Sequence, residues 1–149
     1  MVMTIERPYS GANFLVTIGD ADSHSAAAGF AEVIFPPFVA DAERERGSDR
    51  GHAEDDASSG PSARRLVLRR GVIGSLDLYA WWDETRRAKK PATRLVTIEL
   101  LADDRRTVVM AWRFHRAYPV SISYSPLRAN ECAIVTETVE LAFERVEIE

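Results

Sequence analysis

Apolar side chains recur at every second position along much of this chain, a period that is typical of β-strands. Near the start, Phe14, Val16 and Ile18 follow this period and predict a strand over residues 12–19. The same pattern predicts further strands over residues 29–35, 64–71, 93–101, 107–116 and 118–124. A last long strand, bent or bulged, is predicted over residues 132–146. The chain is therefore expected to be mainly β.

Residues 75–89 have the period of an α-helix instead. Ser75 is placed to cap the helix, and Asp77 lies in its first turn, where a negative charge is favourable. One face carries an apolar stripe at helical spacing, formed by Leu78, Trp81, Trp82 and Thr85. We expect this helix to cover a sheet face or the mouth of a barrel.

Two of the predicted strands, residues 93–101 and 132–146, carry apolar side chains on both faces. A small domain with one solvated sheet face should alternate more cleanly than this. The pattern therefore indicates that another subunit, or the helix, covers the second face of these strands.

Residues 40–63 differ from the rest of the chain. Pro36 and Pro37 end the strand before them, and the segment then carries seven acids and three arginines between Asp41 and Asp56. A Ser/Gly/Pro-rich stretch follows. We interpret it as a long acidic loop, which is either a tolerated insertion or a segment that orders against a neighbouring subunit.

Composition limits the function. With 149 residues, residues 1–149 fit a single domain, and 46% hydrophobic and 28% charged residues are ordinary for a globular protein. The net charge of -4 argues against a general nucleic-acid binder. Residues 1–10 do not resemble a secretory signal, and no apolar run is long enough to span a membrane. Cys132 is the single cysteine, which we interpret as a small buried hydrophobe.

The sequence shows no catalytic, cofactor-binding or metal-binding residues, and we predict no enzyme activity. His24, His52 and His115 lack partners at ligand spacing, and His115 is expected on a strand surface. Residues 20–24 resemble the start of a calcium loop but lack its later glycine and acid. The pairs at residues 55–56 and 103–104 are interpreted as solvated loop carboxylates.

Four arginines lie on the strand over residues 64–71 and raise the question of a phosphate site. In a strand, Arg64 and Arg70 share one face, whereas Arg65 and Arg69 share the other. This division disfavours a single basic patch. We interpret the arginines as solvated or as pairing with another subunit.

Blocks spread over nearly the whole chain resemble the tail-tube proteins of contractile phage tails and phage-tail-like injection systems. The opening is carried by residues 8–9, 13–16 and 29–33, and the strand-to-helix block by residues 68–72 with Leu78, Trp81 and Trp82. The sequence WRFHRAYP at residues 112–119 resembles the tryptophan-strand-proline block of that family. The closing strand is matched at Glu131, Ala133, Ile134, Glu137, Val139, Leu141 and Glu144. Residues 40–63 depart from the family, which has a shorter segment there.

The resemblance implies a β-barrel or sandwich with one flanking helix, whose hexameric rings stack into a hollow inner tube. It also implies partners, namely other copies of the chain, a sheath protein, baseplate or spike and tape-measure proteins, and luminal cargo. It implies neither a membrane anchor nor specific nucleic-acid binding. Such a protein is assembled in the bacterial cytoplasm and becomes part of a tail or a released particle.

Within that interpretation, residues 40–63 are the first candidate for ring stacking. The charged strand residues Arg64, Arg70, Glu99 and Glu137 are candidates for the lumen. Two alternatives remain open at this point, a type VI secretion tube protein and a monomeric ligand-binding β-barrel. A small enzyme of unrecognised type ranks below both.

Overall fold

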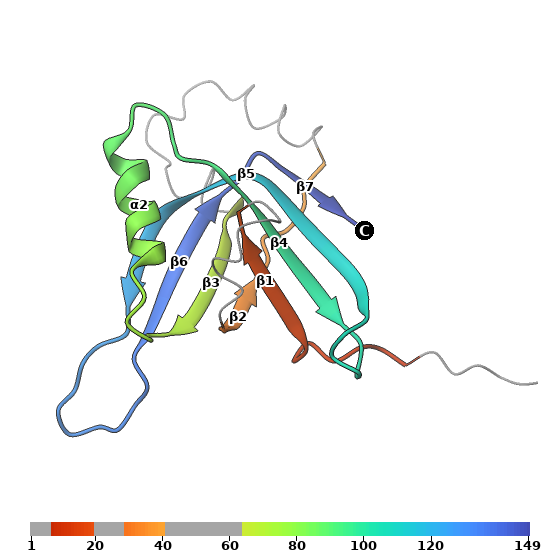
Figure 1. The fold of residues 1–149 in the computed structure, drawn as a ribbon, viewed down its shortest axis with the longest axis horizontal. Coiled ribbons are helices and arrows are strands. Elements are labelled where there is room, and N and C mark those ends of the chain that lie inside the picture. The colour runs from red at the N-terminus through yellow and green to blue at the C-terminus, as the bar shows by residue number, and fades with distance from the viewer. Residues whose placement is uncertain (1–6, 20–28, 41–63) are drawn as a thin grey trace, which may run out of the picture.

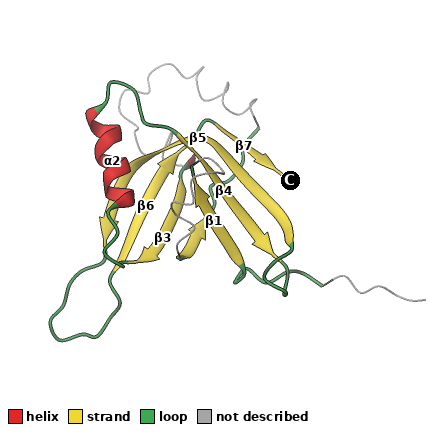
Figure 2. Ribbon diagram, viewed as in Figure 1, coloured by secondary structure: helices red, strands yellow, loops and turns green. Residues whose placement is uncertain are grey.

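The computed structural model describes residues 7–19, 29–40 and 64–149, and these form seven strands and one helix (Figures 1 and 2). The strands are β1 (Phe14–Ile18), β2 (Phe30–Ile34), β3 (Leu66–Gly71), β4 (Arg94–Leu101), β5 (Val108–Tyr124), β6 (Thr136–Ala142) and β7 (Arg145–Ile148). The helix is α2 (Asp77–Arg87). The predicted mainly β chain with one amphipathic helix is confirmed.

All strand pairs are antiparallel, and the order along the sheet is β1-β4-β5-β6-β3-β2, with β7 pairing β5. The long strand β5 belongs to two sheets. Its first half, residues 108–117, pairs with β4 and β7, and with β1 these strands form sheet A. Its second half, residues 118–124, pairs with β6, and with β3 and β2 these strands form sheet B. Figure 1 shows β5 crossing from one sheet to the other.

The crossing explains two corrections to the predicted strands. We expected separate strands at residues 107–116 and 118–124, but β5 is continuous and bends between its halves. Arg116 has a φ of 55°, and the pairing register shifts on both sides of it. Conversely, the predicted strand 132–146 is two strands, because β6 pairs in sheet B and β7 pairs in sheet A.

Helix α2 lies against β5 and is joined to the core by its apolar stripe (Figure 2). Leu78 and Trp81 are buried, and the indole Nε1 of Trp81 donates a hydrogen bond of 2.6 Å to the Ala92 carbonyl. The predicted cap is wrong by one residue, because Leu76 occupies the N-cap position and makes no side-chain cap bond. Ser75 lies just outside, where its hydroxyl accepts a hydrogen bond from the Asp77 amide at 3.4 Å.

A single core joins both sheets and the helix. Val16, Val96 and Phe114 of sheet A pack in the same cluster as residues of sheet B and of α2. The sheet does not close into a barrel, because β1 and β2 lie at opposite ends of the strand order and no pairing joins them among the described strands. The predicted barrel or sandwich is thus observed as a bent, open antiparallel sheet.

Candidate functional site

The features of interest here are surfaces, and the first is a free sheet edge. Residues 118–124 of β5 pair with β6 along one side, and no strand in the described ranges pairs with the other side. At the opposite side of sheet B, β3 is the only described strand that pairs with β2. Unpaired backbone N–H and C=O groups along an edge are a ready template for another chain. Sheet B therefore offers one such edge at each side.

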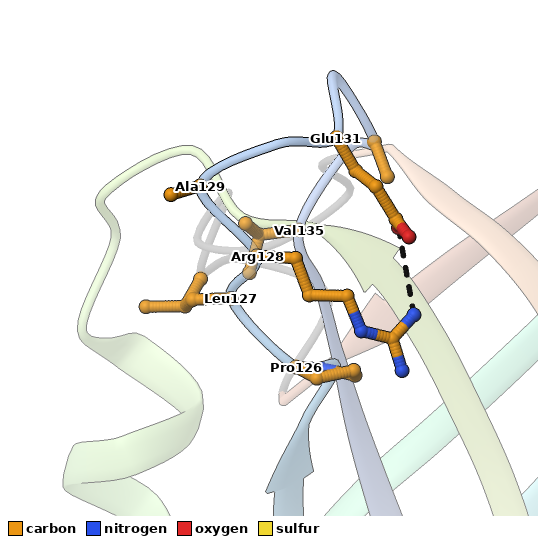
Figure 3. A pocket seen from close by; sticks show the side chains of 7 residues that line it. Pro126, Leu127, Arg128, Ala129, Glu131 and Val135 are labelled. Carbon is orange, nitrogen blue, oxygen red and sulfur yellow. Dashed lines mark hydrogen bonds and ion pairs between the residues drawn. The ribbon is translucent and has the colours of Figure 1, made fainter.

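The second surface is the loop at residues 125–135, which connects β5 to β6 and projects beyond the ends of the strands (Figure 1). Leu127 and Ile134 are about four-fifths exposed, at 81% and 79%. The loop surrounds an open hollow of about 420 Å³, and Arg128 forms a hydrogen bond of 3.4 Å with Glu131 on its rim (Figure 3). Exposed apolar side chains at a projecting loop mark an interaction surface.

The segment before α2 extends that surface. The Val72 amide donates a hydrogen bond of 2.8 Å to the Val135 carbonyl, which fixes the two segments side by side. Ile73 and Leu76 are each 71% exposed. With Leu127 and Ile134 they form what we name the end patch, defined by Val72, Ile73, Leu76, Leu127 and Ile134. The end patch is apolar and lies at one end of sheet B.

A buried charge cluster lies beneath this end of the molecule. Arg70 on β3 is only 1% exposed, and its guanidinium pairs with Glu137 on β6 and with Asp77 at the start of α2. The guanidinium also lies 5.5 Å from the centre of the Phe30 ring, a cation–π contact. The cluster therefore ties β3, β6 and the helix together.

Burial acts to lower the pKa of Arg70, but hydrogen bonds to Asp77 and Glu137 outweigh it and hold that pKa above its ordinary value. Burial likewise acts to raise the pKa of Asp77, and the bonds from Arg70 and Ser75 hold it below its ordinary value. Both groups are thus charged at neutral pH. Burial, with the nearby Glu137 charge, raises the pKa of the Tyr124 hydroxyl.

These positions correct three predictions. Arg70 is neither solvated nor available to another subunit, and neither Arg70 nor Glu137 faces a lumen, because both side chains point into the core. The strand pattern did place Arg70 opposite Arg65 and Arg69, which is confirmed. Cys132 is exposed rather than buried, because the chain joins β6 only at Thr136.

The remaining candidates carry no visible chemistry. His115 lies on sheet A, 3.3 Å from Glu147, as the strand-surface prediction expected. Asp104 caps the β4–β5 turn by accepting hydrogen bonds from Arg106 and Thr107. Within the described ranges there is no group of three potential metal ligands. His24, His52, residues 20–24 and 55–56, and the acidic segment from residue 41 to 63 lie outside the described residues.

In the described part of the chain, no helix has the length and apolarity that crossing a membrane requires.

Comparison with known proteins gives a consistent picture. The sequence matches the family of the T4-like virus tail tube protein gp19 over residues 10–147. No curated protein matches the chain by sequence. Among solved structures, the chain resembles one from the sheath/tube terminator of the extracellular contractile injection system PVC, with a TM-score of 0.71 and 19% identity over 98% of this chain and 99% of that one.

Two further structures share the fold. A chain of the PVC sheath-tube complex in the extended state gives a TM-score of 0.67 and 19% identity, covering 97% of this chain and 93% of that one. Hcp1 from Flavobacterium johnsoniae gives 0.57 and 16% identity, covering 91% and 94%. At these identities the likeness establishes the fold.

Proposed function

Because this chain belongs to the family of the T4-like virus tail tube protein gp19, we propose that it closes into hexameric rings that stack into the inner tube of a contractile tail or injection particle. Family membership makes the chain a structural tail tube protein. The match over residues 10–147 is the observation that carries the proposal. It also supports a non-enzymatic role for residues 1–149 as one tube domain.

The surfaces of the subunit support self-assembly. Among the described strands, sheet B has an unpaired edge on each side, and pairing one edge with the other edge of a neighbouring copy closes a ring that leaves no free edge in sheet B. The end patch supplies apolar contact area beyond the ends of the paired strands, where the loop at residues 125–135 projects. Stacking of rings therefore has a candidate surface in addition to the acidic segment at residues 40–63.

The similar structures support a set of partners and a location. They come from a sheath-tube complex, a sheath/tube terminator, a tube-terminating cap and a baseplate. We propose that this tube likewise contacts a sheath and a baseplate, and that a tape-measure protein and luminal cargo accompany it. Assembly in the bacterial cytoplasm, followed by incorporation into a tail or released particle, fits the same proposal.

A type VI secretion tube protein is the second candidate, because the fold is shared with Hcp1. The two candidates differ in what the subunits assemble into: continuous tubes for a contractile-tail protein, and separate rings for a type VI secretion protein. A monomeric ligand-binding barrel has less support. The described strands do not close, and the hollow of about 420 Å³ lies within an exposed loop.

The test is assembly of the purified chain, followed by negative-stain electron microscopy and sedimentation velocity. We expect rings and tubes. Leu127→Asp combined with Ile134→Asp should leave the subunit folded, because both side chains are exposed, and should reduce tube length sharply. Lys89→Asp, at the exposed end of the helix, is the matched charge control and should assemble normally. A native chain that stays monomeric at high concentration contradicts the proposal.

A further inference from the structure

The outer face of sheet B, the face opposite the core, has an unusual composition. Alternate residues of β3 and β6 point into the core and are buried, which leaves the intervening residues on the outer face. The register places Ser121 beside Glu140 and Ser123 beside Thr138 on that face. Four hydroxyl side chains thus lie on two neighbouring strands: Ser121, Ser123, Thr136 and Thr138.

The charges on this face are paired within it. Arg65 lies 3.3 Å from Glu140, and Arg69 lies 3.4 Å from Glu32 while donating a hydrogen bond of 3.2 Å to Thr138. The two arginines and two glutamates sum to no net charge. The face is therefore hydroxyl-rich and electrically neutral, although Val67 and Ile34 add apolar area at the β2 side.

Helix α2 and sheet A both lie on the core side of sheet B. Helix α2 is held there through Asp77 and Arg70, and sheet A packs against the same core (Figure 2). If copies join edge to edge through sheet B, the bulk of each subunit has to lie outside the closed ring. The outer face of sheet B then points inward.

Sheet A could close a ring in the same way, but it is the poorer candidate. Its edge strands β1 and β7 have five and four residues, whereas the edges of sheet B are residues 118–124 of β5 and the five residues of β2. Short edge strands are a common way to prevent pairing with other chains. The outer face of sheet A carries ion pairs of the same kind, Arg113 with Glu149 and Arg145 with Glu147, so the length of the edge strands, and not charge, distinguishes the two sheets.

We propose that the outer face of sheet B lines the lumen of the tube, and that it forms an electroneutral, hydroxyl-rich wall that does not retain charged polymers. This inference rests on the proposed tube function and specifies its conduit. Luminal cargo then passes without strong attraction to the wall, because the two described arginines on this face, Arg65 and Arg69, are both paired with glutamates.

The location can be tested by cysteine mapping in a Cys132→Ser background, since Cys132 is exposed and would react itself. Thr138→Cys places a thiol on β6, an interior strand of sheet B. Thr97→Cys places the matched thiol on β4, an interior strand of sheet A. Both positions are half-buried. Tubes are first verified by electron microscopy, then treated with N-ethylmaleimide or with biotin-maleimide followed by streptavidin.

We expect the thiol at position 138 to react with N-ethylmaleimide in tubes, while streptavidin binds only at tube ends because the protein cannot diffuse along the lumen. Streptavidin along the tube sides, or complete protection from N-ethylmaleimide, overturns the assignment. End-only labelling at position 97 instead assigns the lumen to sheet A and also overturns it. Electron microscopy shows before labelling whether the native chain forms tubes. If it does not, both the tube function and this inference are refuted.

The neutrality of the wall has its own test. Glu140→Gln leaves Arg65 without its partner in every copy, whereas Glu147→Gln removes the same charge from sheet A. At low salt, Glu140→Gln tubes should bind a fluorescent single-stranded oligonucleotide roughly tenfold more tightly than native tubes, with a steep decline as salt rises. Glu147→Gln tubes should resemble native tubes. Equal binding by both variants, or no gain in either, contradicts the neutral wall.

Discussion

Replacing Glu137 with methionine removes one of the two carboxylates that neutralise the buried guanidinium of Arg70. The substitution keeps most of the side-chain volume, so it changes charge more than packing. Because Arg70 is 1% exposed and Glu137 is 4% exposed, water cannot take the place of the lost carboxylate. Asp77 remains as a partner on the helix, and its side chain is 33% exposed.

Breaking a buried ion pair from one side costs about 3–5 kcal/mol when the other charge is left alone. Since Asp77 still compensates Arg70, we expect Glu137→Met to lower the free energy of unfolding by about 3 kcal/mol. Arg70→Met should cost at least as much, because it leaves Glu137 charged and buried. The double variant Arg70→Met with Glu137→Met should lie within about 1 kcal/mol of the native chain, since well-packed apolar residues often replace such pairs without loss.

The measurement is urea unfolding at a protein concentration too low for assembly, followed by tryptophan fluorescence, with equal m-values required for comparison. Glu140→Gln is the matched control on the same strand pair. Its bridge to Arg65 is partly solvated, with side-chain exposures of 28% and 40%, so its loss should cost less than about 1 kcal/mol. If Glu137→Met costs no more than this control, or if the two single effects add in the double variant, the cluster does not act as reasoned here.

Three further predictions concern the same end of the molecule. Trp81→Ala should lower the free energy of unfolding by about 3–5 kcal/mol, because the indole is fully buried and hydrogen-bonded. In the same urea assay, Trp82→Ala should cost clearly less, because Trp82 is only half-buried. Equal losses would show that the apolar stripe of the helix is misassigned. Folding lowers the pKa of Asp77, so its contribution to stability is present above the unfolded pKa and is lost as the pH falls through the folded pKa. Asp77→Asn should abolish this loss of stability at acid pH, which unfolding curves recorded at a series of pH values measure. Folding raises the pKa of Tyr124, so its contribution to stability is present below the unfolded pKa of about 10 and is lost as the pH rises through the folded pKa. Tyr124→Phe should therefore reduce the loss of stability at alkaline pH. An unchanged loss at alkaline pH contradicts this role of Tyr124.

Local pattern was enough to predict the strands that pair within one sheet. The alternation of apolar and polar residues located β1, β2, β3 and β4 to within a few residues. Helical spacing identified the apolar stripe, of which Leu78 and Trp81 are buried. The errors cluster where one strand serves two sheets. Continuity of β5 through Arg116, and the break between β6 and β7, depend on pairing partners far away in the chain, which periodicity does not report.

The same limit applied to side-chain roles. Alternation placed Arg70 and Glu137 on a face, but it did not show which face is the core, because a shift by one residue reverses every assignment. Arginine in a strand is usually at the surface, so the solvated interpretation of Arg70 was the ordinary one. One signal was available: Asp77 begins the helix seven residues after Arg70, close enough for the helix start to meet the strand end.

The antiparallel pairing of β3 with β6 places oppositely charged side chains next to each other on both faces of this strand pair. On the core face, Arg70 lies opposite Glu137 in the register, and on the outer face Arg65 reaches Glu140. Arg70 and Arg65 are thus each paired with a glutamate of β6, whereas Arg69 lies opposite Thr138 and pairs with Glu32 on β2. A slip of this pairing by one residue would bury Glu140 beside apolar side chains and expose Val139 on the outer face. The charge pairs therefore favour the observed register, in addition to any stability that they contribute.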